Sequence, residues 1–277
     1  MECTVRGVAV YYEEVGAGRP LFMLHGWGLD HRYIANDMEP FFTGRTGWRR
    51  IYLDLPGMGK TPGADWISTH DQMLAVILEF IDTIAPGERF TITGTSYGGY
   101  LARGVVYRRN AQIDGVLLNV PAIEIDDSKR NLPAHRVLRE DAEFLGALKP
   151  EEQEMRDLIV AQSLDVLSKF RELISPAAAL ADQEFLKRLD MSPAFSFDVD
   201  TFPETCSAPT LIVTGRFDHW CGYQEAYRLL DQYPRATFAV LDRSGYALSF
   251  EQPALFTALV NEWLDRVVEY AHQRGTE

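Results

Sequence analysis

The chain has 277 residues, of which 46% are hydrophobic and 24% are charged, and its formal net charge at pH 7 is −13. This composition suits one large globular domain with or without an inserted subdomain, and it excludes a disordered chain. The negative charge disfavours nucleic acid and anionic membranes as partners, and no apolar run approaches the ~18 residues of a membrane helix. Because no apolar signal-peptide core follows the N-terminus, we expect a cytoplasmic protein.

Short apolar runs rich in β-branched residues recur along the chain, and each is closed by glycine, proline or aspartate. They predict strands within residues 8–14, 20–26, 49–57, 89–94, 113–121, 209–215 and 236–242. Amphipathic helical patterns lie between them, most clearly at residues 68–87, where Ser68 and Asp71 resemble a capping box, and at 252–273. This alternation predicts an α/β fold with a doubly wound, mostly parallel sheet.

The segment from residue 123 to 206 breaks the alternation, because it contains no strand candidate. Instead, residues 131–149, 150–174 and 177–189 have the pattern of amphipathic helices. The segment is too long for a loop. We therefore expect a core formed by residues 1–122 and 207–277, with a helical cap at residues 123–206.

The cysteines and histidines give no support for a metal or another cofactor. Cys3, Cys206 and Cys221 have no metal-type spacing and are expected to be free thiols in a reducing compartment. The six histidines also lack a ligand-type spacing.

The pattern Gly94-x-Ser96-x-Gly98 carries the sharpest chemical signal. It follows a predicted strand and precedes a helix, so the serine lies on a tight turn where a substrate can reach it. The start of the following helix adds free N–H groups and the positive end of its dipole. This context predicts a nucleophilic serine.

A nucleophilic serine needs N–H donors for the oxyanion that develops during attack. We expect one from the backbone of Tyr97 and one from Trp27, in the turn "LHGWG" after an earlier strand. His25 lies in the same turn and is expected to organise the loop.

The sequence resembles the α/β-hydrolase superfamily over nearly its whole length, through "HGWG" at 25–28, "DLPGMGKT" at 54–61, "GTSYGG" at 94–99 and "GRFD" at 215–218. The resemblance implies the nucleophile Ser96, the acid Asp218, a structural Asp54, and a histidine after the last strand. At that place the sequence reads Gly245-Tyr246 inside an otherwise fitting frame, "SGYALSFEQP", and no histidine lies between 220 and 271.

Tyr246 changes what the resemblance implies about activity. A phenol has a pKa of about 10, so near pH 7 it donates a hydrogen bond but does not accept a proton from serine. His219, next to Asp218, and His25 are weaker candidates for a replacement base. Loss of one member of a triad leaves only the ~10³–10⁴-fold catalysis given by the oxyanion hole and binding.

Three accounts of the chain follow. It is a serine hydrolase of esters, amides, lactones or C–C bonds that is impaired by Tyr246, a small-molecule binding or sensor protein, or an enzyme that uses Tyr246 as an acid. We favour the first and find the third weakest. We expect a small-molecule ligand and a monomer or homodimer. His25, His219 and Trp220 are candidate pocket residues, and Phe195 and Phe197 suit a pocket or the core equally well.

Overall fold

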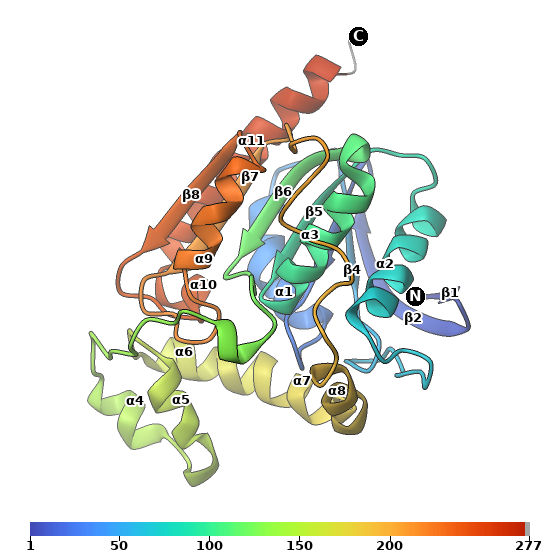
Figure 1. The fold of residues 1–277 in the computed structure, drawn as a ribbon. Helices are drawn as coiled ribbons and strands as arrows, with labels where there is room; N and C mark the ends of the chain where they lie inside the picture. Colours follow the sequence, from blue (N-terminus) through green and yellow to red (C-terminus); the bar gives the residue numbers. More distant parts are fainter. Residues whose placement is uncertain (275–277) are drawn as a thin grey trace.

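The computed structural model describes residues 1–274, which form one sheet of eight strands with helices on both faces (Figure 1). The strand order is β1-β2-β4-β3-β5-β6-β7-β8. β2 pairs antiparallel with β1 and β4, whereas β3 to β8 are parallel. The strands are β1 (Glu2–Val5), β2 (Val8–Gly16), β3 (Arg19–Leu24), β4 (Trp48–Leu53), β5 (Phe90–Thr95), β6 (Ile113–Asn119), β7 (Thr210–Gly215) and β8 (Ala236–Leu241). The predicted doubly wound, mostly parallel sheet is confirmed.

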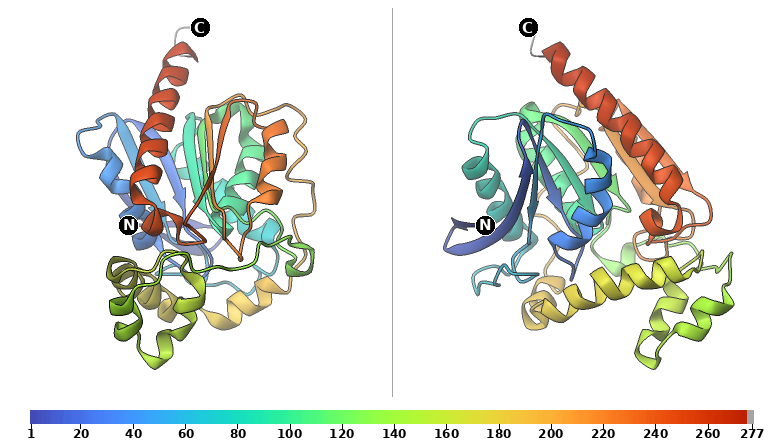
Figure 2. Two further views of the ribbon diagram at one scale, coloured as in Figure 1. Left: turned by 90° about the vertical axis from the view of Figure 1, so that its left-hand side faces the viewer. Right: turned by 180° about the vertical axis from the view of Figure 1, so that it is seen from behind.

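The two faces of the sheet are covered by different helices, because successive side chains of a strand point in opposite directions. In β3, Leu21 and Met23 join the apolar cluster that includes α1 (His31–Met38) and α11 (Pro253–Arg274). Phe22 and Leu24 join the cluster of α2 (His70–Ile84) and α3 (Tyr97–Arg109). Figure 2 shows α11 running along one face up to the C-terminal end.

The expected strands all occur, and two other features differ from the prediction. The sequence analysis missed β1, a short edge strand that pairs with β2. The capping box of α2 lies one residue later than Ser68 and Asp71: Gln72 N donates to Thr69 Oγ1, and Thr69 N donates to Gln72 Oε1. Gln72 is the longer partner and reaches back to the cap, which the Asp71 side chain does not do.

The segment between β6 and β7 contains five short α-helices. They are α4 (Ala142–Ala147), α5 (Gln153–Leu158), α6 (Leu164–Lys169), α7 (Ser175–Leu180) and α8 (Gln183–Asp190). A π-helical turn at Phe170–Ile174 joins α6 to α7. We call residues 123–206 the insertion; its helices gather beyond one end of the sheet in Figures 1 and 2.

The insertion is less helical than its sequence pattern predicts. The expected helix at 131–149 is helical only in α4, because the backbone N–H groups of Leu138 and Arg139 donate to Val160 O. The expected helix at 150–174 breaks before Ser163, which caps α6. The third breaks at Asp182, which caps α8 while its own N–H donates to Gly57 O. Tertiary contacts therefore override helical periodicity.

Short helices α9 (Gln224–Tyr227) and α10 (Leu248–Glu251) complete the described fold. In residues 1–274, no helix has both the length and the apolar character to span a membrane.

Candidate active site

Ser96 lies at the turn between β5 and α3, in a backbone conformation with φ 54° and ψ −117°. Such a conformation is strained for a residue with a side chain, and strain of this kind gathers at functional sites. The neighbouring glycine is sterically required: a Cβ on Gly98 would lie 2.2 Å from Leu24 O. The tight packing of α3 against β3 thus presents the hydroxyl of Ser96 at the carboxyl edge of the sheet.

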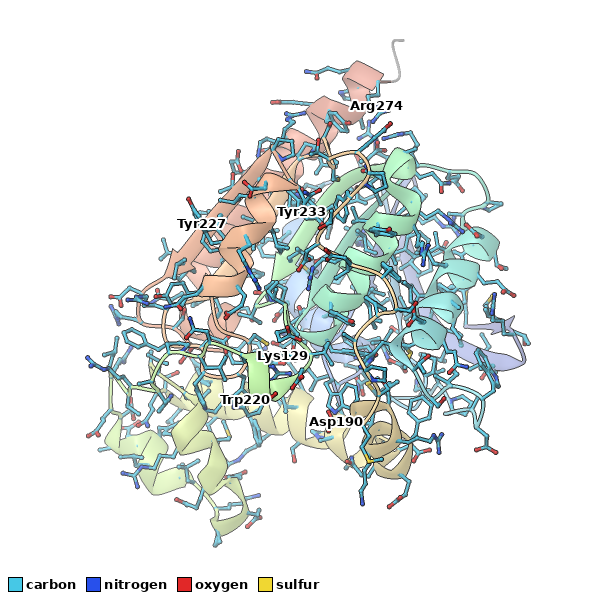
Figure 3. All side chains as sticks on the ribbon, in the orientation of Figure 1. Lys129, Asp190, Trp220, Tyr227, Tyr233 and Arg274 are labelled. Atoms are coloured by element: carbon cyan, nitrogen blue, oxygen red, sulfur yellow. The ribbon has the colours of Figure 1, made fainter. Side chains whose placement is uncertain are left out.

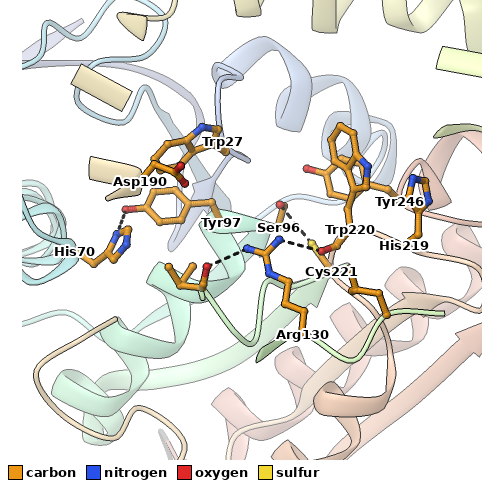
Figure 4. Close-up of a pocket in the computed structure, with 12 residues that line it drawn as sticks. Trp27, His70, Ser96, Tyr97, Arg130, Asp190, His219, Trp220, Cys221 and Tyr246 are labelled. Atoms are coloured by element: carbon orange, nitrogen blue, oxygen red, sulfur yellow. Dashed lines mark hydrogen bonds between the residues drawn. The ribbon is translucent and has the colours of Figure 1, made fainter. Parts of the chain in front are cut away.

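Ser96 faces a cavity of about 470 Å³ (Figure 4). The core contributes Trp27, His70, Ser96, Tyr97, His219, Trp220, Cys221 and Tyr246 to its lining, and the insertion contributes Ile125, Arg130, Leu132 and Asp190. The pocket therefore brings together the predicted nucleophile, the predicted oxyanion residues and the residue in the base position. Its walls come from elements far apart in the sequence.

Trp27 and Tyr97 lie next to one another in the pocket, with their rings in an edge-to-face contact at 4.9 Å. Tyr97 is the first residue of α3, so the helix does not need its backbone N–H. Their role as oxyanion donors remains a prediction.

Asp218 follows β7 and is completely buried. Its Oδ1 accepts hydrogen bonds from the backbone N–H groups of Trp220, at 2.9 Å, and Cys221, at 3.0 Å. Its Oδ2 is buried with no hydrogen-bond partner among the described residues. Burial raises the pKa of Asp218 to about 6, although backbone hydrogen bonds oppose the rise. One carboxylate oxygen is thus held in place, and the other is left to accept a donor.

Tyr246 follows β8, and its side chain reaches the part of the pocket that contains Ser96. A Cβ on Gly26 would lie 3.3 Å from the Tyr246 hydroxyl and 3.4 Å from Ser96 Cβ. The Tyr246 ring lies 4.9 Å from the Trp220 ring. Burial raises the pKa of the Tyr246 phenol, nearby Cys221 and Asp218 raise it further, and a hydrogen bond with Ser96 opposes the rise. The phenol is therefore neutral across the physiological pH range.

Cys221 is a site residue that the sequence analysis missed. Its Sγ lies 3.6 Å from Ser96 Oγ, and Figure 4 shows this contact. Burial and the charge of Asp218 raise the pKa of the thiol, so it stays protonated. The only signal in the sequence is its place three residues after Asp218. Cys3, Cys206 and Cys221 are all free, in agreement with their prediction.

The structure corrects the assignment of His25 to the candidate pocket. His25 is completely buried and does not line the cavity. Its Nδ1 donates to Gly26 O at 2.8 Å, and its Nε2 accepts from Leu55 N at 3.0 Å. Both nitrogens are therefore engaged in holding the loop, which leaves neither for the proton of Ser96.

His219 and Trp220 do line the pocket. The His219 ring lies 4.7 Å from the ring of His135, and Figure 4 places His219 beyond Tyr246 as seen from Ser96.

His70 is a second pocket residue that the sequence analysis missed. Its Nδ1 lies 2.9 Å from the hydroxyl of Tyr97, and burial lowers the pKa of His70 to about 4. A neutral imidazole thus holds the Tyr97 phenol at the end of the pocket away from Ser96 (Figure 4). Phe195 and Phe197, in contrast, stack against one another and join the apolar core.

One group of side chains in residues 1–274 has ligand atoms close enough for a metal ion: Asp30, His31 and Asp54. These atoms already serve the fold. Asp54 accepts hydrogen bonds from His31 Nδ1 and from Lys60 N, both at 2.8 Å, and Asp30 caps α1. We therefore assign these three residues a structural role, in which they hold the start of α1 against the loop after β4.

Figure 3 places Trp220 of the core on the side that faces the insertion, in the region where Lys129 and Asp190 of the insertion lie. Lys129 forms an ion pair with Asp126 at 3.0 Å. Arg130, next in the chain, donates to Glu124 O and Trp220 O. The bond from Arg130 to Trp220 O ties the insertion's first residues to a core residue that lines the same pocket.

Comparison with known proteins places this geometry in context. Residues 21–259 match the model of the alpha/beta hydrolase family. A 2-hydroxy-6-oxo-6-(2'-aminophenyl)hexa-2,4-dienoic acid hydrolase of Metapseudomonas resinovorans is 23% identical over 94% of this chain and 89% of the relative. A pimeloyl-[acyl-carrier protein] methyl ester esterase of Legionella pneumophila is also 23% identical, over 92% and 99%. The crystal structure of an alpha/beta superfamily hydrolase from Oenococcus oeni is 29% identical with a TM-score of 0.86, over 96% and 99%.

Proposed function

Because the chain belongs to the α/β-hydrolase family, we propose that its pocket is a serine-hydrolase site for acyl transfer on a small molecule, slowed by Tyr246. The observation that carries this proposal is the strained Ser96 facing the cavity, with the unpartnered Oδ2 of Asp218 buried nearby. The Oδ1 atom of Asp218 holds the loop, whereas the desolvated Oδ2 does nothing for the fold. It suits a site built for a cationic or donating partner.

In the proposed reaction, Ser96 Oγ attacks the carbonyl carbon of an ester, amide, lactone or ketone. The backbone N–H groups of Trp27 and Tyr97 hold the oxyanion, the C–X bond of the leaving group breaks, and water then releases the acyl group from Ser96. Each step needs a group that takes a proton and later returns it. Tyr246, with its neutral phenol, donates a hydrogen bond but takes no proton near pH 7.

Residues of the insertion support its proposed role as a cap. Arg130 and Asp190 bring opposite charges to the pocket, while Leu132 and Ile125 bring apolar surface. We therefore propose that residues 123–206 select a ligand with both polar and apolar parts. The activities named for the two relatives, an ester hydrolase and a dienoic acid hydrolase, support the carbonyl-compound class.

The test is labelling with a fluorophosphonate probe, together with hydrolysis of short-chain p-nitrophenyl esters by the wild type and by Ser96→Ala. Slow labelling and weak turnover that both disappear in Ser96→Ala support the proposal. Ordinary hydrolase rates in the wild type contradict the slowing effect of Tyr246, and weak turnover that survives in Ser96→Ala contradicts the nucleophile.

A non-catalytic binding or sensor role is the second candidate. It is favoured by the position of Tyr246, whose phenol fills the place of the base while the cavity stays open. The melting temperature, measured with and without short-chain carboxylates, distinguishes the two. Binding without any Ser96-dependent labelling or turnover favours this alternative.

A further inference from the structure

Tyr246 lines two cavities. One is the pocket that contains Ser96, and the other is a small cavity of about 10 Å³ between the insertion and the core. The second cavity is lined by apolar side chains, among them Val166, Phe170 and Phe250. An apolar cavity of this size stays dry, because a water molecule there would find no hydrogen-bond partners.

Tyr246 is the one residue that the linings of these two cavities share. It packs against all three apolar clusters of the described chain, including the cluster of the insertion around Met155 and Val166. Its hydroxyl lies beside Ser96, so the polar end of the Tyr246 side chain belongs to the Ser96 pocket, and the ring faces apolar surroundings. The wall between the cavities is therefore one side chain thick.

We propose that Tyr246 limits the size of the ligand on this side of the pocket: an acyl chain that starts at Ser96 must end at the phenol ring. The ligand class that fits is a carboxylic acid, or its ester, with a short acyl chain. This inference uses the proposed site only to place the carbonyl end at Ser96. It concerns binding and does not require turnover.

Removal of the ring converts the wall into a passage lined by apolar side chains. A methylene group that moves from water to apolar surroundings improves binding about fourfold. In the wild type, methylenes beyond the wall stay in water or lie against the ring edge, so affinity stops rising with chain length. In Tyr246→Ala, the fourfold increment continues for the few methylenes that fit the volume of the removed ring together with the second cavity.

The experiment is calorimetric titration with straight-chain carboxylates from butanoate to decanoate. Tyr246→Phe removes only the hydroxyl and keeps the wild-type profile. Tyr246→Ala shifts the optimum to longer chains, and Val166→Phe in the alanine background restores the short optimum by filling the space that the ring leaves. Val166 does not line the Ser96 pocket, so Val166→Ala alone, which enlarges the second cavity without opening the wall, serves as the matched control.

Should Tyr246→Ala fail to fold, Tyr246→Leu opens the same wall with less loss of apolar volume. The same chain-length profile in the wild type and in the opened variants, including no binding by any of them, overturns the inference. Absence of esterase activity in every variant contradicts the proposed hydrolase function and leaves these binding profiles readable.

Discussion

Replacement of Tyr246 by histidine should convert the site into a working hydrolase. An imidazole at this position lies between two groups that the structure already provides. The buried Oδ2 of Asp218 has no partner in the described chain and can accept a hydrogen bond from Nδ1–H. Ser96, whose hydroxyl meets the phenol of Tyr246 in the native chain, can then donate its proton to Nε2.

The size of the gain follows from general base catalysis. A positioned base contributes ~10²–10⁴ in rate, which corresponds to about 3–5 kcal/mol of transition-state stabilisation. Separately, a hydrogen bond to the unpartnered Oδ2 of Asp218 should stabilise the folded variant by part of the ~1–3 kcal/mol that a buried unsatisfied group costs. We therefore expect kcat/KM for short-chain p-nitrophenyl esters to rise by about 10²–10⁴. The gain should appear above the pKa of the new histidine, near the usual ~6.5, because only neutral imidazole accepts the proton.

The assay is initial-rate hydrolysis of these esters between pH 5 and pH 9. Tyr246→Phe controls for loss of the phenol hydroxyl, and Ser96→Ala in the histidine background shows whether the gained rate passes through the nucleophile. A folded Tyr246→His variant that gains less than about tenfold would refute the reasoning, because general base catalysis rarely contributes so little. A gain that persists without Ser96 would refute it as well.

Three other substitutions test the electrostatics and strain of the site. Burial raises the pKa of Asp218 from 3.8 to about 6, so its ionisation destabilises the fold as pH rises through 4–6. The stability of Asp218→Asn relative to the wild type should therefore increase by about 3 kcal/mol between pH 4 and pH 7 in urea unfolding, and a difference that does not change with pH would contradict this. Ser96→Gly should be about 1 kcal/mol more stable than Ser96→Ala, because glycine accepts φ 54° without strain; equal stability would show that the turn is relaxed. Glu251 accepts hydrogen bonds from Val160, Ala161 and Gly245, so Glu251→Gln should lower the free energy of unfolding by about 1–3 kcal/mol, whereas the exposed Glu262→Gln should change it by less than about 0.5 kcal/mol.

The fold could be predicted largely from local patterns. Several of the parallel strands, among them β3, β6 and β7, are buried and largely apolar runs, and such runs are visible without tertiary information. β1 was not predicted because "ECTV" is too short to show a strand pattern, and it becomes a strand only through its pairing with β2. The insertion's helix boundaries escaped because Val160 and Gly57 accept hydrogen bonds from distant backbone groups, and no local pattern encodes those bonds.

The site could be predicted only where a motif ties a residue to the end of a strand. Ser96, Asp218 and Tyr246 follow β5, β7 and β8, so their common edge follows from the topology. His70 and Cys221 carry no motif, and they reach the pocket through the packing of α2 and of the loop after Asp218. His25 shows the converse: it belongs to a motif, yet one ring nitrogen binds its own loop and the other binds the loop after β4.

Tyr246 combines two effects that a single substitution does not separate. An imidazole is smaller than a phenol, so Tyr246→His adds a base and also thins the wall toward the cavity near Val166. If only long-chain esters react faster, the cause is the enlarged pocket. If acetate esters react faster, the cause is the new base, because an acetyl group is too short to use the second cavity. Tyr246→Leu opens the wall without a base. The ratio of acetate to octanoate ester hydrolysis in the two variants therefore assigns each gain to its physical cause.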